Sequence, residues 1–285
     1  LKCEARAPAR AGPQRGAFGS GLHAARAPSP PPVPPIPGAA MATSEAVFSP
    51  EPRKGSSVSQ ASGSRGRPNE GAICIVLAAG FSQVERDLDV AGAENAGVPK
   101  ALLPVAGKPM LDHWWGYLSQ NRRISEVFVI SNALKYKHFE RWATAKGMPM
   151  SRVINSGATA AERSRGVLRD VELGLRRAQQ VLGDLDGRDV ITFAGDTLFF
   201  KDFDLDRILD FRATKGGSLL LYYGTSEARG SPSERGMCMV DATTNEVTAF
   251  AEKPAEGTRG CGFPYVSPLF YIFEPAAWQQ IPAFN

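Results

Sequence analysis

Cysteine and histidine are scarce in this 285-residue sequence, and neither is clustered. The four cysteines lie far apart and form no CxxC pair, which argues against a disulfide framework or a zinc site and suits a reducing compartment. The three histidines show no ligand spacing. No apolar run approaches the roughly 18 residues of a membrane span. We therefore expect a cytoplasmic protein with no membrane span.

Two common ligand-binding motifs are also missing. Gly107-Lys108 lacks the upstream glycine of a P-loop, so a P-loop NTPase is not supported. The acids at 202, 204 and 206 resemble the start of an EF-hand loop. However, Arg207 stands at its sixth position and Ala213 at its twelfth, so calcium binding is rejected. We expect these acids to cap and solvate the first turn of a helix.

The formal net charge of +4 comes from one end of the chain. Residues 1–69 carry nine Lys and Arg against three acids, whereas residues 70–285 carry 24 basic and 26 acidic residues. Because the body is slightly acidic, a basic nucleic-acid-binding fold is not supported, and we expect no nucleic-acid partner.

Residues 1–69 form a tail rich in proline, glycine, serine and arginine. Segments 28–37 and 56–67 cannot bury enough apolar surface to offset the entropy of ordering, so we expect disorder. The sequence begins with Leu1 and its first methionine is Met41, so either the record is incomplete at its start or residues 1–40 are not translated. The acid-poor composition also fits an organelle transit peptide, and disorder without function and targeting both stay open.

Residues 70–285 show the alternation of an α/β fold. A continuous apolar, β-branched run at 72–77 is typical of a strand buried on both faces of a parallel sheet. A Gly- and Ala-rich loop is expected to follow it, to about residue 99. Further strands are expected at 127–130, 152–154, 190–194 and 218–223. Helices are expected at 110–120, 135–146, 163–182 and 205–214.

This order predicts three α/β/α layers around a mostly parallel, Rossmann-like sheet. After residue 230 the pattern changes to short strands, at 237–240, 247–251 and 266–273. We interpret these strands as a small mixed-sheet lobe appended to the main sheet. We expect 70–285 to form one domain, because two independent domains would be too small.

Three segments fall at the carboxyl ends of the expected strands, where open α/β sheets bind ligands. Leu77-Ala-Ala-Gly80 would let a flat ligand approach the backbone, although on its own a plain turn explains it better. Lys100, held between prolines, could meet phosphate oxygens or be an ordinary surface lysine. Asp196 could hold Mg²⁺ against a nucleotide or cap a helix.

The order and spacing of four motifs resemble one family. LAAG, PKALLPVAGKPML, AGD and the EKP at 252–254 look like the sugar-phosphate nucleotidylyltransferases, from about 73 to 273. The resemblance implies the fold of nucleotide-diphospho-sugar transferases. It also implies a reaction in which an NTP and a sugar 1-phosphate give a nucleotide sugar and pyrophosphate, with Mg²⁺ as cofactor. Catalysis would be mostly positioning and charge neutralisation.

The resemblance also implies roles for individual residues. Lys100 would contact the phosphates and Asp196 would bind Mg²⁺. The nucleotide-binding residues would be Leu77, Ala78, Ala79, Gly80, Asn155, Gly157 and Thr159. The residues on the sugar-phosphate side would be Gly236, Glu252 and Lys253, for which an ordinary strand end with solvated charges is the alternative.

Two departures from the family bear on activity. Val84 stands where the family has an arginine that grips the triphosphate, and Arg86 lies two residues further on. Relatives have a second metal-binding aspartate beyond the EKP strand, whereas no acid follows Glu274 here. We therefore expect either a domain truncated at its C-terminus or an incomplete metal site.

Three functions follow from this resemblance. The leading one is an active nucleotidylyltransferase. The second is a catalytically weak relative that binds a nucleotide or nucleotide sugar and regulates a partner. The third keeps the enzyme class but takes phosphocholine or a similar phosphorylated alcohol. The sequence leaves open the base, the sugar and whether the chain forms a homo-oligomer.

Overall fold

The computed structural model describes residues 71–92, 94–185, 187–199, 203–224, 236–252 and 265–284. All of them lie within 40–285, one of two units into which the chain divides. The tail at 1–69 and Lys253 lie outside the described residues, so disorder of the tail stays a prediction. None of the helices among the described residues combines the length and apolarity needed to cross a bilayer.

The main sheet contains six strands in the order β5-β4-β1-β6-β12-β7. Four of them pair in parallel: β1 (Ala72–Ala78), β4 (Ile124–Ser131), β5 (Val153–Asn155) and β6 (Val190–Ala194). β12 (Phe270–Phe273) lies antiparallel between β6 and β7 (Leu219–Leu220). The prediction of a mostly parallel sheet is confirmed.

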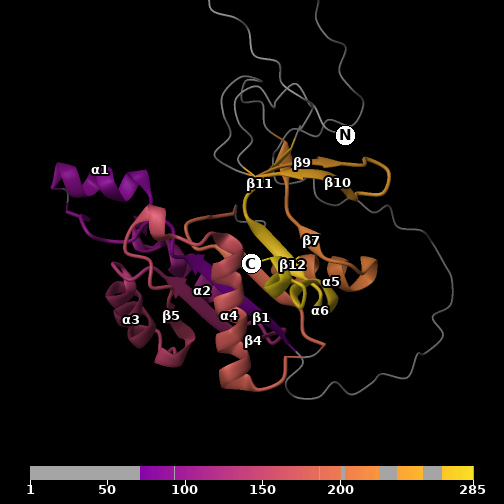
Figure 1. The fold of residues 1–285 in the computed structure, drawn as a ribbon, viewed down its shortest axis with the longest axis horizontal. Helices are drawn as coiled ribbons and strands as arrows, with labels where there is room; N and C mark the ends of the chain where they lie inside the picture. The colour runs from indigo at the N-terminus through magenta and orange to yellow at the C-terminus, as the bar shows by residue number, and fades with distance from the viewer. Residues whose placement is uncertain are drawn as a thin grey trace, which may run out of the picture. The chain divides into compact units, whose positions relative to one another are not determined.

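Both faces of this sheet are covered by helices (Figure 1). Cys74 and Val76 of β1 pack with α2 (Met110–Leu118), α3 (Tyr136–Ala145) and α5 (Leu205–Lys215). Ile73 and Ile75 point the other way, to α4 (Val167–Leu182) and α6 (Pro275–Trp278). Because successive strand residues face opposite sides, a continuous apolar run fits this position. The three predicted layers are confirmed.

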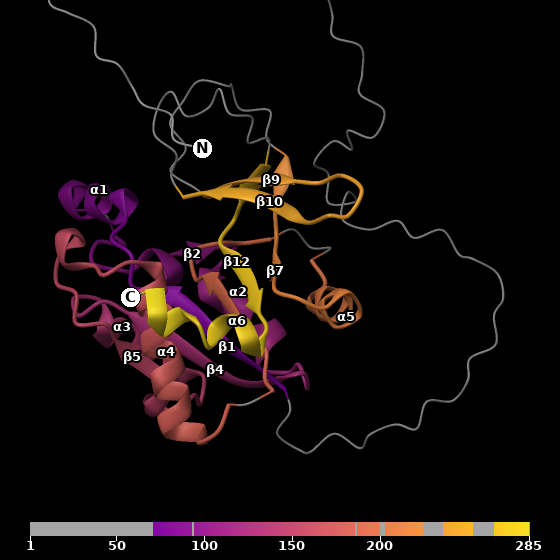
Figure 2. The same ribbon diagram turned by 45° about the vertical axis from the view of Figure 1, so that its right-hand side comes forward.

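One helix lies where the sequence predicted only a loop. Within 78–99 the structure has α1 (Gln83–Ala91), which ends at Gly92 with a left-handed φ of 60°. Figures 1 and 2 both show α1 projecting from the sheet. Its exposed residues include Val84 and Val90 beside polar ones, and Gln83 donates to Asp87 across one turn at 2.6 Å. Val84, Leu88 and Ala91 do stand at helical spacing, but this signal spans only nine residues, and the helix turns Glu85 inward instead of these apolar residues.

Two predicted strands are each divided between sheets. The run at 218–223 gives β7 in the main sheet and β8 (Tyr223–Gly224) in the second. The run at 266–273 gives β11 (Tyr265–Ser267) and β12, separated by Pro268 and by Leu269 with a φ of 55°. Proline and a left-handed residue interrupt a strand ladder, which explains the break.

The second sheet has the order β10-β9-β11-β8, and all its described pairings are antiparallel. β9 (Gly236–Val240) and β10 (Val247–Ala251) form a hairpin, and the chain passes from β11 into β12 of the main sheet (Figure 1). The predicted small lobe is therefore present as a separate sheet, but its described pairings are antiparallel and not mixed as predicted. Short 3₁₀ helices also occur: η1 (Lys100–Leu102), η2 (Met150–Arg152), η3 (Ala161–Arg163) and η5 (Ile281–Phe284).

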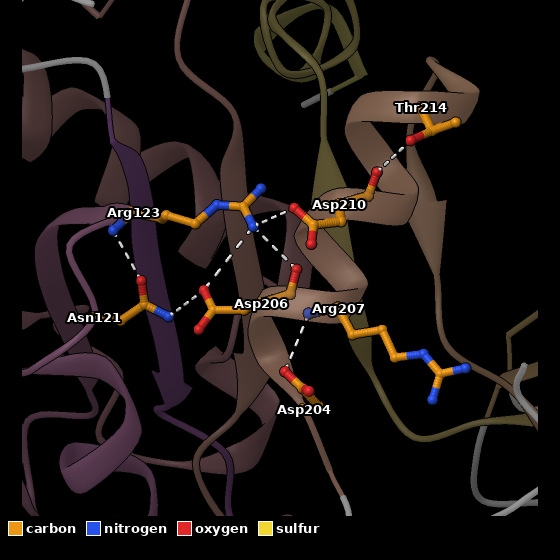
Figure 3. Close-up of polar contacts among 7 residues, drawn as sticks. All are labelled: Asn121, Arg123, Asp204, Asp206, Arg207, Asp210 and Thr214. Atoms are coloured by element: carbon orange, nitrogen blue, oxygen red, sulfur yellow. Dashed lines mark hydrogen bonds and ion pairs between the residues drawn. The ribbon is translucent and has the colours of Figure 1, made fainter. Parts of the chain in front are cut away.

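The acids at the start of α5 are structural, as expected (Figure 3). The Asp204 carboxylate accepts a hydrogen bond from Arg207 N at 3.0 Å and so caps the helix. Arg123 donates to the Asp206 carbonyl at 3.0 Å and to the Asp210 carboxylate at 2.7 Å, which fastens α5 to the segment before β4. Asp202 lies outside the described residues.

The first turn of α4 contains a carboxylate that is costly to ionise. Burial raises the pKa of Asp170 from 3.8 to about 6. The folded protein therefore holds a proton there between these two pH values that the unfolded chain releases. Since the native state binds more protons in this window, its stability falls as pH rises from about 4 to 6.

We expect Asp170→Asn to raise the free energy of unfolding at pH 7.5 by about 1–2 kcal/mol, because two pKa units correspond to about 3 kcal/mol and partial solvation reduces this. At pH 4 the gain should disappear. Urea titration at both values measures this, with the exposed Asp87→Asn as the control. An equal effect at pH 4 and 7.5 would contradict the burial argument.

Candidate functional site

Strand register gathers the predicted residues at one edge of the main sheet. Ala78 of β1 pairs with Ser131 of β4, which pairs with Asn155 of β5. On the other side Leu77 pairs with Ala194 of β6, and Gly195 N donates to the Leu77 carbonyl at 2.9 Å. The ends of four parallel strands therefore lie side by side, as open α/β binding sites require.

The two predicted catalytic residues meet directly at this edge. Lys100 Nζ lies 2.8 Å from Asp196 Oδ2, and each side chain is 36% exposed. Lys100 begins η1 after Pro99, whereas Asp196 follows β6. A Cβ at Gly195 would lie 3.0 Å from Val76 Cγ1, so glycine allows this turn to approach β1 closely. Because both side chains are accessible to solvent, this ion pair can open, and each group can then contact a charged ligand instead of its partner.

An aromatic cluster holds the segment that follows Asp196. Trp114 of α2 is buried, and its indole N–H donates to the Thr197 carbonyl at 2.6 Å. Its ring stacks on Phe193 with a centroid separation of 4.0 Å and packs edge-on against Phe199 and Phe203. Trp114 is thus a packing residue that also positions the Asp196 turn.

Asn132 is a buried residue of this edge that the sequence reasoning missed. Its amide nitrogen donates to the carbonyls of Ala79 and Gly80, both at 3.3 Å, and its carbonyl oxygen accepts from Lys135 N at 3.0 Å. The side chain is 1% exposed. It therefore ties the end of β1 to the start of α3. The available signal was a polar pair, Ser131-Asn132, directly after a buried strand.

A second missed group joins α1 to η1. The Glu85 carboxylate accepts a hydrogen bond from Lys100 N through Oε1, and Lys135 Nζ lies 4.0 Å from Oε2. Lys135 also donates to the Gly97 carbonyl at 2.9 Å. Burial raises the pKa of Glu85, while the Lys100 N–H and the Lys135 charge act in the opposite direction. The edge therefore holds a chain of contacts: Asp196 pairs with the Lys100 ammonium, the Lys100 backbone N–H donates to Glu85, and Glu85 faces the Lys135 ammonium.

The predicted base-contacting segment begins at the end of β5, and its residues Asn155, Gly157 and Thr159 are exposed, whereas Ala158 between them is buried. The Asn155 carboxamide oxygen accepts from Gly157 N at 2.9 Å, which closes a turn in which Gly157 has a φ of 77°. Thr159 Oγ1 accepts from Arg163 at 3.1 Å. The loop lies beside the ends of β4 and β5, and its contact with a base stays a prediction.

Two of the three predicted sugar-phosphate residues, Gly236 and Glu252, lie close together at the second sheet. A Cβ at Gly236 would lie 3.2 Å from Glu252 Oε2 and 2.6 Å from Phe250 Cζ, so only glycine fits here without displacing a neighbour. Ser267 pairs with Gly236, and its hydroxyl donates to Tyr271 Oη at 3.4 Å. Lys253 lies outside the described residues, and within them no hydrogen bond or ion pair joins this group to Lys100 or Asp196.

The residue at the family's arginine position does not supply a cation. Val84 lies on α1 with 46% of its surface exposed. Arg86 points along the same helix, where Nε donates to the Gln83 carboxamide oxygen at 3.0 Å. Binding of phosphate by Arg86 would require this contact to break.

The residues at this edge fit a magnesium ion that is bound by one protein carboxylate and takes its other ligands from substrate phosphates and waters. Among the described residues no three His, Cys, Asp or Glu side chains gather into a metal-binding group. Mg²⁺ is commonly bound by one or two carboxylates together with phosphates and waters. The partly exposed Asp196 carboxylate fits such a site.

Three comparisons with known proteins agree on the class of fold. Residues 95–283 match a family model described as nucleotidyl transferase. A mannose-1-phosphate guanyltransferase alpha-A of Xenopus laevis is 27% identical over 201 residues, and a mannose-1-phosphate guanylyltransferase regulatory subunit alpha-A of Danio rerio is 25% identical over 201. Each alignment covers 65% of this chain and 41% of the relative, so the chain spans less than half the length of these relatives.

Among solved structures, a Bacillus anthracis protein described as a glucose-1-phosphate thymidylyltransferase superposes with a TM-score of 0.53. It is 17% identical, and the match covers 75% of this chain and 76% of that protein. This likeness confirms the predicted fold class.

Asn132 provides a test of how this edge is held together. We expect Asn132→Ala to lower the free energy of unfolding by about 2 kcal/mol, because it leaves buried polar groups of two loops without a partner. Asn155→Ala, which removes one hydrogen bond from an exposed turn, should cost less than about 1 kcal/mol. Urea unfolding of both variants measures the difference. Equal costs would show that the buried amide does not hold the edge.

Proposed function

The chain belongs to the nucleotidyl transferase family, and on that basis we propose that it transfers a nucleotidyl group from an NTP to a sugar 1-phosphate. The contact between Lys100 and Asp196 carries the proposal. This contact brings an ammonium and a carboxylate together at the edge where this fold class binds ligands, and we propose that the first serves phosphate oxygens and the second Mg²⁺.

In the proposed reaction an oxygen of the sugar phosphate attacks the α-phosphorus of the NTP. A new P–O bond forms there, and the bond from the α-phosphorus to the bridging oxygen breaks. Pyrophosphate leaves with that electron pair. No protein nucleophile is needed, because the sugar phosphate oxygen itself attacks. Mg²⁺, when bound, neutralises charge on the phosphate oxygens. Lys100 would leave Asp196 for a phosphate oxygen, which stabilises charge that grows on the leaving group.

The proposed binding residues follow the register of the sheet. Residues 77–80 lie between the ends of β4 and β6, where a base and ribose can approach small side chains, and 155–159 lie beyond β4. Gly236, Glu252 and Lys253 would bind the sugar phosphate. The Glu252 carboxylate can accept hydrogen bonds from sugar hydroxyls, and the Lys253 ammonium can pair with phosphate.

A second function is a weakly active relative that binds a nucleotide or nucleotide sugar and regulates a partner. Val84 at the expected arginine position favours it, as does the similarity to a relative named as a regulatory subunit. A phosphorylated alcohol such as phosphocholine is a third candidate acceptor. Cytoplasmic location and homo-oligomerisation remain predictions from the sequence.

Pyrophosphate release tests the leading function. The 285-residue protein is incubated with Mg²⁺, each NTP and a panel of sugar 1-phosphates and phosphocholine. We expect release with one pair of substrates and a loss of about 100-fold or more in kcat/KM for Lys100→Ala and for Asp196→Asn, since each removes charge stabilisation. Lys215→Ala, at the exposed end of α5, is the matched control and should keep the wild-type rate.

Silence of the wild-type protein over the whole panel would refute catalysis by this chain. Calorimetry then separates the remaining candidates. Tight binding of a nucleotide or nucleotide sugar without turnover is the result that the regulatory function predicts, whereas absence of binding contradicts both functions.

A further inference from the structure

The buried residue of α1 is a carboxylate, Glu85. It is 8% exposed, whereas Val84 and Val90 of the same helix are 46% and 90% exposed. Acidic side chains are rarely buried unless they are paired. The inward position of an isolated surface helix normally belongs to an apolar residue, so the choice of a charged one requires a reason.

The donors around Glu85 are those that bind phosphate oxygens in other proteins. Oε1 accepts from a backbone N–H, that of Lys100, and Oε2 faces the Lys135 ammonium at 4.0 Å. Backbone amides together with a lysine form many phosphate sites. The Lys135 side chain is 13% exposed, so its charge is kept away from bulk water.

The same edge holds its other lysine in the same way, because Lys100 Nζ lies 2.8 Å from Asp196. Each ammonium is thus neutralised by a carboxylate of the chain itself. We propose that Lys135 and the Lys100 N–H form a binding site for a phosphate group of the nucleotide, and that the Glu85 carboxylate fills this site until a triphosphate displaces it. This inference rests on the proposed function for the identity of the ligand.

Several features favour the exchange. A triphosphate carries more negative charge than one carboxylate, so both lysines gain from it. Burial and the negative charges of Asp89 and Asp196 all raise the pKa of Glu85, which means that its ionised form is penalised where it lies. Release into water removes that penalty. α1 projects from the sheet, so its movement disturbs no layer of the core (Figures 1 and 2).

The exchange also accounts for Val84. A helix that turns Glu85 inward turns Val84 toward solvent. Lys135 would then supply a cation from α3's N-terminal side, in place of one from α1. Charge for the phosphates would come from Lys135 after β4 and from Lys100 at the start of η1. Asn132 holds the backbone N–H of Lys135, and Glu85 holds that of Lys100.

Calorimetry with inorganic triphosphate tests the proposal on the full chain, without magnesium. Glu85→Gln keeps an oxygen for the Lys100 N–H but removes the competing charge, so it should tighten binding roughly tenfold. Lys135→Met should weaken binding roughly tenfold. The controls are Asp87→Asn on α1 and Lys137→Met on α3, which are exposed and should bind as the wild type does.

The double variant Glu85→Gln, Lys135→Met decides between competition and a purely structural role. If Glu85 competes for Lys135, the gain from Glu85→Gln disappears in the double variant. If Glu85 only fastens α1, Glu85→Gln lowers the melting temperature without ligand and weakens binding. That second pattern overturns the proposal. So does triphosphate binding that is the same in Glu85→Gln as in the wild type, or the absence of binding in both the wild type and Glu85→Gln.

The pyrophosphate-release assay keeps the two ideas apart. If the triphosphate pattern holds but no NTP reacts with any acceptor, the proposed function fails and the phosphate site stands. If the wild type turns over and Glu85→Gln leaves its KM for NTP unchanged, the proposed function stands and this inference fails.

Discussion

The candidate site depends on the parallel pairing of β1 with both β4 and β6. This register brings Leu77 opposite Ala194 and Ala78 opposite Ser131, so all three strands end at one line. Segments that are more than 100 residues apart, such as 77–80 and 194–196, become neighbours only through it. The contact of Lys100 with Asp196, the bridge made by Asn132 and the position of residues 155–159 all follow from this alignment.

The sequence was sufficient for the elements whose burial is continuous. β1 lies between two helix layers, so an unbroken apolar run was enough to place it and to predict three layers. The motifs at Lys100 and Asp196 could also be recognised from the sequence, because binding residues are often carried by loops at strand ends. Their direct contact was not predicted, since periodicity contains no information on which loops meet across a sheet.

What escaped prediction has identifiable physical causes. α1 is only nine residues long and its inward residue, Glu85, is charged, so its short apolar spacing at Val84, Leu88 and Ala91 did not indicate a helix. The segment 266–273 was predicted as one strand, yet Pro268 and the left-handed φ of Leu269 turn it from one sheet into the other. Asn132 and Lys135 belong to no motif in the sequence. Their importance comes from tertiary contacts, in which Asn132 donates to the Ala79 carbonyl and Lys135 to the Gly97 carbonyl.

The central claim is that a nucleotide is bound and activated where Lys100 and Asp196 meet. A crystal structure of the chain with Mg²⁺ and a non-hydrolysable NTP tests it most directly. The account predicts that the triphosphate lies beyond the ends of β1 and β6, with Lys100 Nζ hydrogen-bonded to a phosphate oxygen. A nucleotide bound elsewhere, with Lys100 still paired to Asp196, would contradict it.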